Sequence, residues 1–176
     1  MMHPNENRVG AVARMSVKTE VFIGLGSNLG DPIGQIQTAI DSLSEALEGL
    51  TRAHLYRSKP LGPQDQPDFI NTAVQGFTHL SPESLLSLCQ QIEAEQGRVR
   101  TQHWGPRTVD LDILYYGAHN IRTDVLVIPH PEIMHRSFVT RPLLDLMPQG
   151  LMPTGDHIDA NRYDFSELIR IDHHKD

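Results

Sequence analysis

The sequence predicts an α+β protein with a ferredoxin-like sandwich, in which a largely antiparallel sheet is flanked by helices. Strand-like apolar runs and helix-like periodic segments follow one another in the order strand-helix-strand, strand-helix-strand, and a proline-rich loop separates the two halves. The same alternation could form a parallel doubly wound sheet. We favour the sandwich because the first 116 residues hold only two full-length helical segments.

The first half begins with residues 20–26, whose apolar run is typical of a buried strand. Asp31 and Pro32 then begin a helix, because Asp caps free backbone amides and Pro suits the first turn. Gly49 can end this helix, and residues 51–58 are expected to form a strand. The apolar face of the helix is formed by Ile33, Ile36, Ile40, Leu43 and Leu47.

The second half repeats this order after the proline-rich loop. Residues 69–78 form the next expected strand, Ser81 and Pro82 begin a helix, and Gly97 ends it. Residues 108–116 follow as a strand of period 2. The remaining expected elements are an extended piece at residues 121–128 and a helix from about residue 137 to 146, and the apolar face of the second helix comprises Leu85, Leu88, Cys89 and Ile92.

Composition limits the function before any motif is considered. The chain has 176 residues and a formal net charge of -7, so it fits one domain and lacks the excess of Lys and Arg that general nucleic-acid binding needs. Its single cysteine, Cys89, permits no intramolecular disulfide and suits a cytoplasmic location. No apolar run approaches the ~18 residues of a membrane-spanning helix. We expect a flexible leader at residues 1–18, one folded domain at 19–150, and a tail at 151–176 that packs on the domain or trails from it.

Asp110 and Asp112 are the strongest local signal for chemistry. Residues two apart in a strand point to the same side, so both carboxylates converge on one spot while Val109, Leu111 and Ile113 face a core. Two like charges this close favour a cation beside them, and hard oxygen ligands suit magnesium, which also takes substrate phosphates. A solvated strand face would carry the same tripeptide, so that alternative stays open.

A cluster of arginines precedes the two aspartates. Arg98, Arg100 and Arg107 lie within ten residues with no acidic residue between them, and guanidinium forks match phosphate oxygens. Beside a magnesium-binding pair, such a cluster describes a nucleotide-triphosphate site; a solvated basic patch is the alternative. Trp104, the only tryptophan, either stacks on a planar heterocycle or caps the core.

Two further segments suggest where another ligand would bind. Leu61 and Phe69 of the proline-rich loop offer apolar walls, and the amide of Asn71 could read the edge of a heterocycle; a purely structural loop is the alternative. His130 and Arg136 could reach phosphate or be ordinary surface residues.

A glycine run at residues 24–30 follows a strand and precedes a helix, which is the position of a dinucleotide-binding fingerprint. Its spacing is wrong for that function, since Leu29 stands where the third glycine is needed. We therefore interpret the run as a tight strand-to-helix turn.

Four ordered blocks of the chain together resemble the bacterial 6-hydroxymethyl-7,8-dihydropterin pyrophosphokinases of folate biosynthesis. They read VFIGLGSNLGD, PLGPQDQPDFINTAV, GRVR…WGPRTVDLDIL and IPHPEIMHRSFVTRPLLDL, and they cover roughly residues 20–150. The resemblance implies a ferredoxin-like fold, two Mg²⁺ ions, and transfer of pyrophosphate from ATP to the pterin hydroxymethyl group with release of AMP.

The resemblance also assigns roles by position. It implies that Asp110 and Asp112 bind the metal and that, with Arg98, Arg100 and Arg107, they form the catalytic set. The implied ATP contacts are Gln90, Glu93, Arg98, Arg100, Trp104, Arg107, Ile113, His130 and Arg136. The implied pterin contacts are Ser58, Pro60, Leu61, Phe69, Asn71, Trp104 and Phe138.

Two departures from the family pattern leave other functions open. Val125 and Val127 stand at the nucleotide edge where a member of the family carries Arg and Thr, which would suit a paralogue that binds its ligands with little turnover. An unrelated magnesium phosphohydrolase that uses the aspartate pair is the other alternative. The expected partners are ATP and the pterin, with no nucleic acid and no membrane, and the chain is expected to act as a cytoplasmic monomer.

Overall fold

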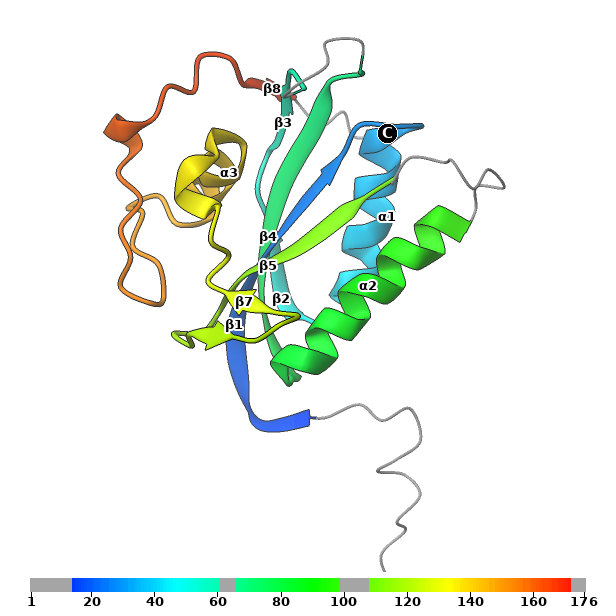
Figure 1. The fold of residues 1–176 in the computed structure, drawn as a ribbon, viewed down its shortest axis with the longest axis vertical. Coiled ribbons are helices and arrows are strands. Elements are labelled where there is room, and N and C mark those ends of the chain that lie inside the picture. Colours follow the sequence, from blue (N-terminus) through cyan, green and yellow to red (C-terminus); the bar gives the residue numbers. More distant parts are fainter. Residues whose placement is uncertain (1–13, 61–65, 99–107, 172–176) are drawn as a thin grey trace, which may run out of the picture.

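The computed structural model describes residues 14–60, 66–98 and 108–171, which form a six-stranded sheet with helices on both of its faces and a separate two-stranded sheet (Figure 1). In chain order the elements are β1 (Arg14–Ser27), α1 (Pro32–Ser44), β2 (Glu48–Arg52), β3 (Leu55–Ser58), β4 (Phe69–Leu80), α2 (Pro82–Arg98), β5 (Asp110–Tyr116), β6 (Ile121–Arg122), β7 (Val127–Ile128), η3 (Ile133–His135), α3 (Ser137–Leu146), η4 (Ala160–Arg162) and β8 (Ile169–Ile171).

The main sheet has the strand order β5-β1-β4-β3-β8, with β2 also paired to β4. Each of these pairs is antiparallel. Two βαβ units joined by an antiparallel central pair give this order, so the predicted ferredoxin-like α+β fold is confirmed. The antiparallel pairing among the described strands rules out the parallel doubly wound alternative.

The two faces of the sheet are covered differently. In Figure 1, α1 and α2 lie along one face, while α3 and the C-terminal segment lie on the other. The larger core lies between the sheet and α1 and α2, where Ile36 and Leu43 of α1 are fully buried. A second core on the α3 side contains Phe22, Tyr115 and Leu143.

Helix α1 begins where the sequence predicts it but ends early. The Asp31 carboxylate accepts from the backbone amide of Gly34 at 3.2 Å, as expected for a helix cap. The helix ends at Ser44, so Leu47 is buried from the connecting segment and not from the helix. The prediction that Ile33 belongs to the buried face is wrong, since its side chain is 38% exposed.

The predicted strand at residues 51–58 is divided into β2 and β3, which pair with successive parts of β4. The division falls at Ala53 and His54, where the backbone amide of His54 bonds to the Asp145 carboxylate at 3.1 Å. The backbone amide of His54 thus bonds to a side chain of helix α3. A pattern of apolar residues in the sequence could not predict that a helix provides this hydrogen-bond partner.

Strand β5 departs from strict alternation. Phe22 of β1 pairs with Tyr115 but the next residue, Ile23, pairs with Ile113, so Leu114 is the extra residue of a β-bulge. Leu114 and Tyr115 therefore both lie in or beside the α3-side core. The alternation predicted for residues 108–116 holds only up to the bulge.

Several outlying elements agree with their predicted positions. Helix α3 spans the predicted residues, and the predicted extended piece at 121–128 contains the hairpin of β6 and β7.

Strand β1 is longer than expected and begins at Arg14, within the predicted leader. In the segment after residue 150, Met152 and Ile158 are buried and β8 pairs with β3. Within the described ranges, no helix combines the length and the apolar character needed to cross a membrane.

Candidate functional site

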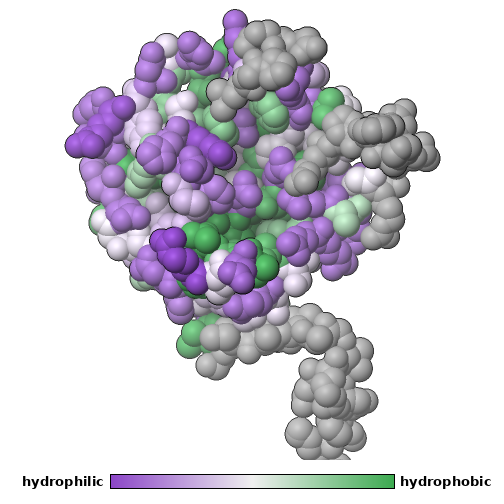
Figure 2. All heavy atoms as spheres, in the orientation of Figure 1, coloured by the Kyte–Doolittle hydropathy of each residue, from purple (hydrophilic) through white to green (hydrophobic). Residues whose placement is uncertain are grey.

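A cavity of about 310 Å³ opens on the α3 side of the sheet. Strands β1, β3, β4 and β5 and the first turn of α3 contribute to its walls. Figure 2 shows hydrophilic side chains over most of the viewed face and a smaller hydrophobic area below its centre. The lining residues are Gly24, Leu25, Gly26, Ser58, Lys59, Gln66, Phe69, Asn71, Thr72, Ala73, Asp110, Asp112, Leu114, Arg136, Phe138 and Val139.

The two aspartates stand on the same side of β5, as their spacing predicts, and both line the cavity. Asp110 is half-buried and Asp112 is exposed. The residues opposite them on β1 are Gly26 and Gly24, respectively. Because glycine has no side chain, the sheet surface beside the carboxylates is left open for a ligand.

The glycine run therefore serves two purposes, of which the sequence interpretation gave one. Gly30 has φ +69° and makes the turn into α1. Gly24 and Gly26 lie inside β1, where a Cβ at Gly26 would stand 2.6 Å from Oδ1 of Asn71. These two glycines form the floor of the cavity, and their alternate spacing in a strand was the available signal.

The aspartate pair fits a magnesium ion that takes its other ligands from phosphate and water. Carboxylate oxygens are the hard donors that magnesium prefers, and one or two of them are the usual protein share of such a site. Across residues 14–60, 66–98 and 108–171, no set of three or more His, Cys, Asp or Glu side chains is arranged to hold a metal. A complete protein cage is therefore absent from that part of the chain.

Contacts from two other segments hold β5 in place beside the cavity. Glu93 of α2 accepts from the backbone amide of Leu111, between the two aspartates, at 2.7 Å. The backbone amide of His130 donates to the carbonyl of Leu114 at 3.1 Å. The ring Nδ1 of His130 accepts from the amide of Glu132 at 3.1 Å, which assigns the proton of a neutral ring to Nε2.

The opposite wall of the cavity is built from cross-strand pairs. Ser58 of β3 pairs with Phe69 of β4, and Asn71 of β4 is only 8% exposed. Phe138 faces this wall from α3, and the Arg136 guanidinium carbon lies 6.0 Å from its ring centre. A planar molecule could therefore lie between two aromatic residues with its edge toward a buried amide.

Seven of the predicted site residues line this one cavity: Ser58, Phe69, Asn71, Asp110, Asp112, Arg136 and Phe138. Among the other described residues, Pro60 is buried, Gln90 is exposed on α2, and Ile113 is packed into the core on the α1 and α2 side. Arg98 ends α2. The positions of Leu61, Arg100, Trp104 and Arg107 lie outside the described residues.

The cavity also contains residues that the sequence argument did not single out. Thr72, Ala73, Leu114 and Val139 belong to this group. Strand register places Thr72 and Ala73 there, the β5 bulge places Leu114 there, and the first turn of α3 contributes Val139. Val125 and Val127 lie at the β6–β7 hairpin, and Val125 is 75% exposed.

Cys89 lies in the core on the α1 and α2 side, outside the cavity lining, and is not suited to act as a nucleophile. Its side chain is buried on α2, and burial, followed by the charges of Glu93 and Asp112, raises the pKa of the thiol to about 12. The reactive thiolate is thus disfavoured near neutral pH.

Comparison with known proteins places this chain among named relatives. Residues 22–148 match the family model for 7,8-dihydro-6-hydroxymethylpterin-pyrophosphokinase. The chain is 45% identical to a 2-amino-4-hydroxy-6-hydroxymethyldihydropteridine pyrophosphokinase of Haemophilus influenzae, over 78% of this chain and 87% of the relative. It is 46% identical to the Pseudomonas aeruginosa protein of the same name, over 78% of this chain and 86% of that protein.

Solved structures show the same fold at lower identity. The crystal structure of wild-type Plasmodium falciparum HPPK-DHPS with pterin and p-hydroxybenzoate matches with a TM-score of 0.59 and 16% identity. The match covers 78% of this chain and 41% of the Plasmodium chain. The present chain thus spans about two fifths of that longer protein.

Proposed function

The chain belongs to the 7,8-dihydro-6-hydroxymethylpterin-pyrophosphokinase family, and we propose that its cavity is the place where the two substrates of this enzyme meet. It is an ATP-dependent pyrophosphokinase that transfers pyrophosphate from ATP to the hydroxymethyl group of 6-hydroxymethyl-7,8-dihydropterin. The products are AMP and the pterin diphosphate, in a step of folate biosynthesis. ATP is the co-substrate, and Mg²⁺ accompanies it.

One observation carries this assignment of the cavity: the aspartate pair and the buried amide of Asn71 line the same space. The aspartates suit the metal-bound phosphates, and the amide suits the pterin edge, which offers both donors and acceptors. Phe69 and Phe138 supply flat apolar surfaces for the pterin ring on either side. Ser58, Pro60 and Leu61 complete the proposed pterin site with Trp104.

The phosphate end of the proposed site is formed by basic residues. Arg98, Arg100 and Arg107 are assigned to the phosphates by their place in the family motif, and Arg136 lines the cavity. The other proposed ATP contacts are Gln90, Glu93, Trp104, Ile113 and His130.

The reaction depends mainly on positioning the two substrates and on neutralising the charge of the phosphates. The hydroxymethyl oxygen bonds to the β-phosphorus, the bond from that phosphorus to the bridging oxygen of the α-phosphate breaks, and the hydroxyl proton is released. Asp110 and Asp112 are proposed to hold two Mg²⁺ ions. Bound magnesium neutralises phosphate oxygens and lowers the pKa of the attacking hydroxyl. Asn71 and the aromatic walls hold the hydroxymethyl group in line for attack.

The cysteine content of the chain bears on the cellular compartment in which the enzyme acts. A single buried cysteine suits a reducing cytoplasm, and we propose that the protein acts there as a monomer on small-molecule substrates. Sedimentation velocity at assay concentrations tests this, because a dimer would sediment as a distinct faster species.

The direct test of function measures AMP formed from ATP and Mg²⁺, with and without 6-hydroxymethyl-7,8-dihydropterin. We expect AMP only when the pterin is present, and none when magnesium is removed by a chelator. Inorganic phosphate released from ATP without pterin would instead indicate a phosphohydrolase. A folded protein that binds both ligands and forms no AMP would contradict the proposal.

A further inference from the structure

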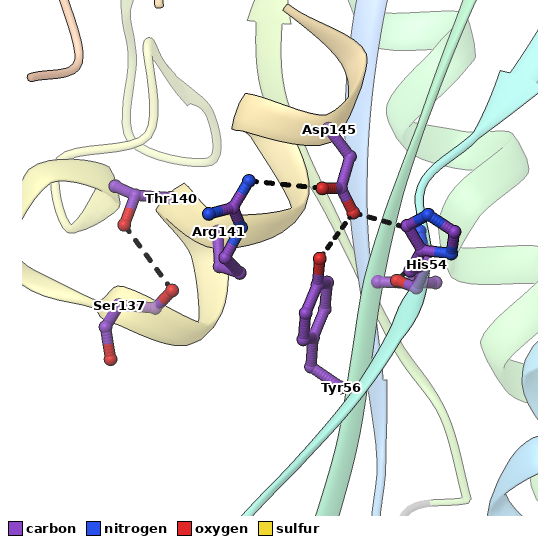
Figure 3. A network of polar contacts seen from close by, with 7 residues as sticks. His54, Tyr56, Ser137, Thr140, Arg141 and Asp145 are labelled. Carbon is purple, nitrogen blue, oxygen red and sulfur yellow. Dashed lines mark hydrogen bonds and ion pairs between the residues drawn. The ribbon is translucent and has the colours of Figure 1, made fainter. Parts of the chain in front are cut away.

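A polar network joins helix α3 to strand β3 beside the cavity (Figure 3). At its centre is Asp145, whose side chain is only 14% exposed. One carboxylate oxygen accepts from the hydroxyl of Tyr56 at 2.7 Å and from the backbone amide of His54 at 3.1 Å. The other oxygen accepts from Nη2 of Arg141 at 3.2 Å, one turn earlier in α3.

The β3 end of this network reaches the proposed pterin wall. Tyr56 pairs directly with Asn71 of β4, and opposed residues of an antiparallel pair lie on the same face. Ser58, two residues along β3, lines the cavity. Any shift of Tyr56 is therefore passed to the strand pair that carries Asn71.

The α3 end of the network reaches the facing wall. Phe138 and Val139 line the cavity from the first turn of α3, and Asp145 stands near the end of the same helix. Helix α3 runs without interruption from Ser137 to Leu146, through Pro142, and so connects Asp145 to Phe138. A bond at Asp145 therefore fixes how far Phe138 stands from Asn71.

The electrostatic setting supports a persistent bond. Burial, together with the hydrogen bond to Asp145 and its charge, raises the pKa of Tyr56 to about 12, so the phenol keeps its proton at neutral pH. Arg141 offsets the charge of the partly buried Asp145 carboxylate, and its guanidinium carbon also lies 5.2 Å from the ring centre of Phe165. Charge-assisted hydrogen bonds of this kind are among the stronger ones.

We propose that Asp145 is a positioning residue for the pterin. Its bond to Tyr56 sets the distance between the side of the cavity that carries Asn71 and the facing side that carries Phe138. This inference rests on the proposed pterin site. The network acts mainly on one substrate because β3 is separated from β5, which carries the aspartates, by β4 and β1. Pterin binding depends on the network more than binding of the magnesium nucleotide does, because α3 reaches the proposed phosphate contacts only through Arg136 at its N-terminal end.

Two conservative variants test the proposal. Tyr56→Phe removes the hydroxyl and keeps the ring, and Asp145→Asn keeps the shape of the side chain and removes its charge. Calorimetry measures the Kd for 6-hydroxymethyl-7,8-dihydropterin and, separately, for a non-hydrolysable ATP analogue with Mg²⁺. We expect each variant to weaken pterin binding about threefold to tenfold, the usual worth of one hydrogen bond. Nucleotide binding should change by a clearly smaller factor, because of the proposed contacts only Arg136 belongs to the start of α3.

The matched control is Tyr163→Phe, which removes a hydroxyl that donates to the carbonyl of Met134 at 2.9 Å, away from the cavity. It loses the same kind of bond and should leave the pterin Kd at the wild-type value. All variants are measured well below their melting temperatures. The double variant of Tyr56 and Asp145 should weaken pterin binding by less than the two single effects combined, because both substitutions act on the bond between these two residues.

The outcomes separate the two proposals. A wild-type protein that binds no pterin overturns the proposed site and this inference with it. If the wild type binds pterin and both folded variants bind it equally well, the site stands and the positioning role of Asp145 is refuted. Equal weakening by Tyr163→Phe, or parallel loss of nucleotide binding, would show general loosening of the fold and would also refute it.

Discussion

The same strands form both faces of the sheet, but one face packs against two helices and the other lines the cavity. On β1, Val21, Ile23 and Leu25 are almost fully buried toward α1 and α2. Gly24 and Gly26, which alternate with Ile23 and Leu25 along the strand, line the cavity on the α3 side. On β5 the contrast is the same, with Leu111 and Ile113 in the core and the two aspartates in the cavity.

This difference separates the residues that stabilise the fold from the residues that are available to bind a ligand. Two helices of 13 and 17 residues cover one face, so aliphatic side chains can fill it. The 10-residue α3 and the following segment leave part of the other face open, and glycine, amide and carboxylate groups occupy that part. We call the face under α1 and α2 the closed face and the face that lines the cavity the open face. Substitutions on the closed face should therefore change the free energy of unfolding, and those on the open face should change turnover.

The largest effect is expected for Asp110→Ala on the open face. Losing one of two proposed magnesium ligands should lower kcat by about a thousandfold, or about 4 kcal/mol of transition-state stabilisation. The free energy of unfolding should stay close to that of the wild type. Steady-state AMP formation and urea unfolding check the two halves of the prediction. Wild-type turnover in the variant would remove the metal role from Asp110.

Leu43→Ala is the converse on the closed face. Leu43 is fully buried against the sheet, and truncating such a side chain costs about 2–5 kcal/mol of stability. Turnover per folded molecule should stay near the wild-type value, because Leu43 is not among the cavity residues. Urea unfolding and active-site titration measure both quantities. A matching fall in kcat would mean that the two faces are not independent.

Gly26→Ala tests the floor of the cavity. The new Cβ would stand 2.6 Å from Oδ1 of Asn71, so the amide must move. We expect pterin binding to weaken by about tenfold, as overpacking of this kind costs about 1–3 kcal/mol. The matched control is Gly97→Ala in α2, where a Cβ meets no atom within 4 Å among the described residues. Pterin affinity that is unchanged in Gly26→Ala would argue against Asn71 as the residue that recognises the pterin edge.

Gln35→Leu tests whether the closed face supports the open one. The Gln35 amide donates to the carbonyl of Leu29 at 2.6 Å and to the carbonyl of Thr108 at 3.2 Å, just before β5. Gln96 of α2 donates to the backbone carbonyl of Gln35 at 3.0 Å. Losing the amide should cost about 1 kcal/mol of stability and lower kcat about threefold. A kcat equal to that of the wild type would limit Gln35 to folding.

The smallest effect concerns Cys89 and pH. The pKa of its thiol is raised from 9.0 to about 12, so folding favours the protonated form. The resulting stability is fully present below about pH 9 and is lost as pH rises toward 12. Unfolding free energies measured from pH 8 upward should fall less steeply in Cys89→Ala than in the wild type. Identical slopes would contradict the raised pKa.

Local patterns predicted the elements that depend on local physics. Asp31 and Pro32 fixed the start of α1, and the spacing of Asp110 and Asp112 placed both on one face of a strand. The bulge at Leu114 and the division at His54 depend on the partner strand or helix. No local pattern reports such a partner.

The sequence singled out several residues that share one cavity, and it passed over residues that carry no chemical signal. Ser58, Phe69 and Asn71 meet in the cavity as the family resemblance implied. Asp145 gave no signal, because an acidic residue near the end of a helix is typical of a solvated surface. Only the packing of α3 on β3 makes it a partly buried acceptor for Tyr56.

The most direct test of the division between the two faces compares AMP formation and unfolding in Asp112→Ala and Leu43→Ala at equal concentrations of folded protein. We predict that Asp112→Ala unfolds like the wild type and forms almost no pterin-dependent AMP, while Leu43→Ala is destabilised and turns over normally. Pterin-dependent AMP formation at the wild-type rate by Asp112→Ala would contradict the account.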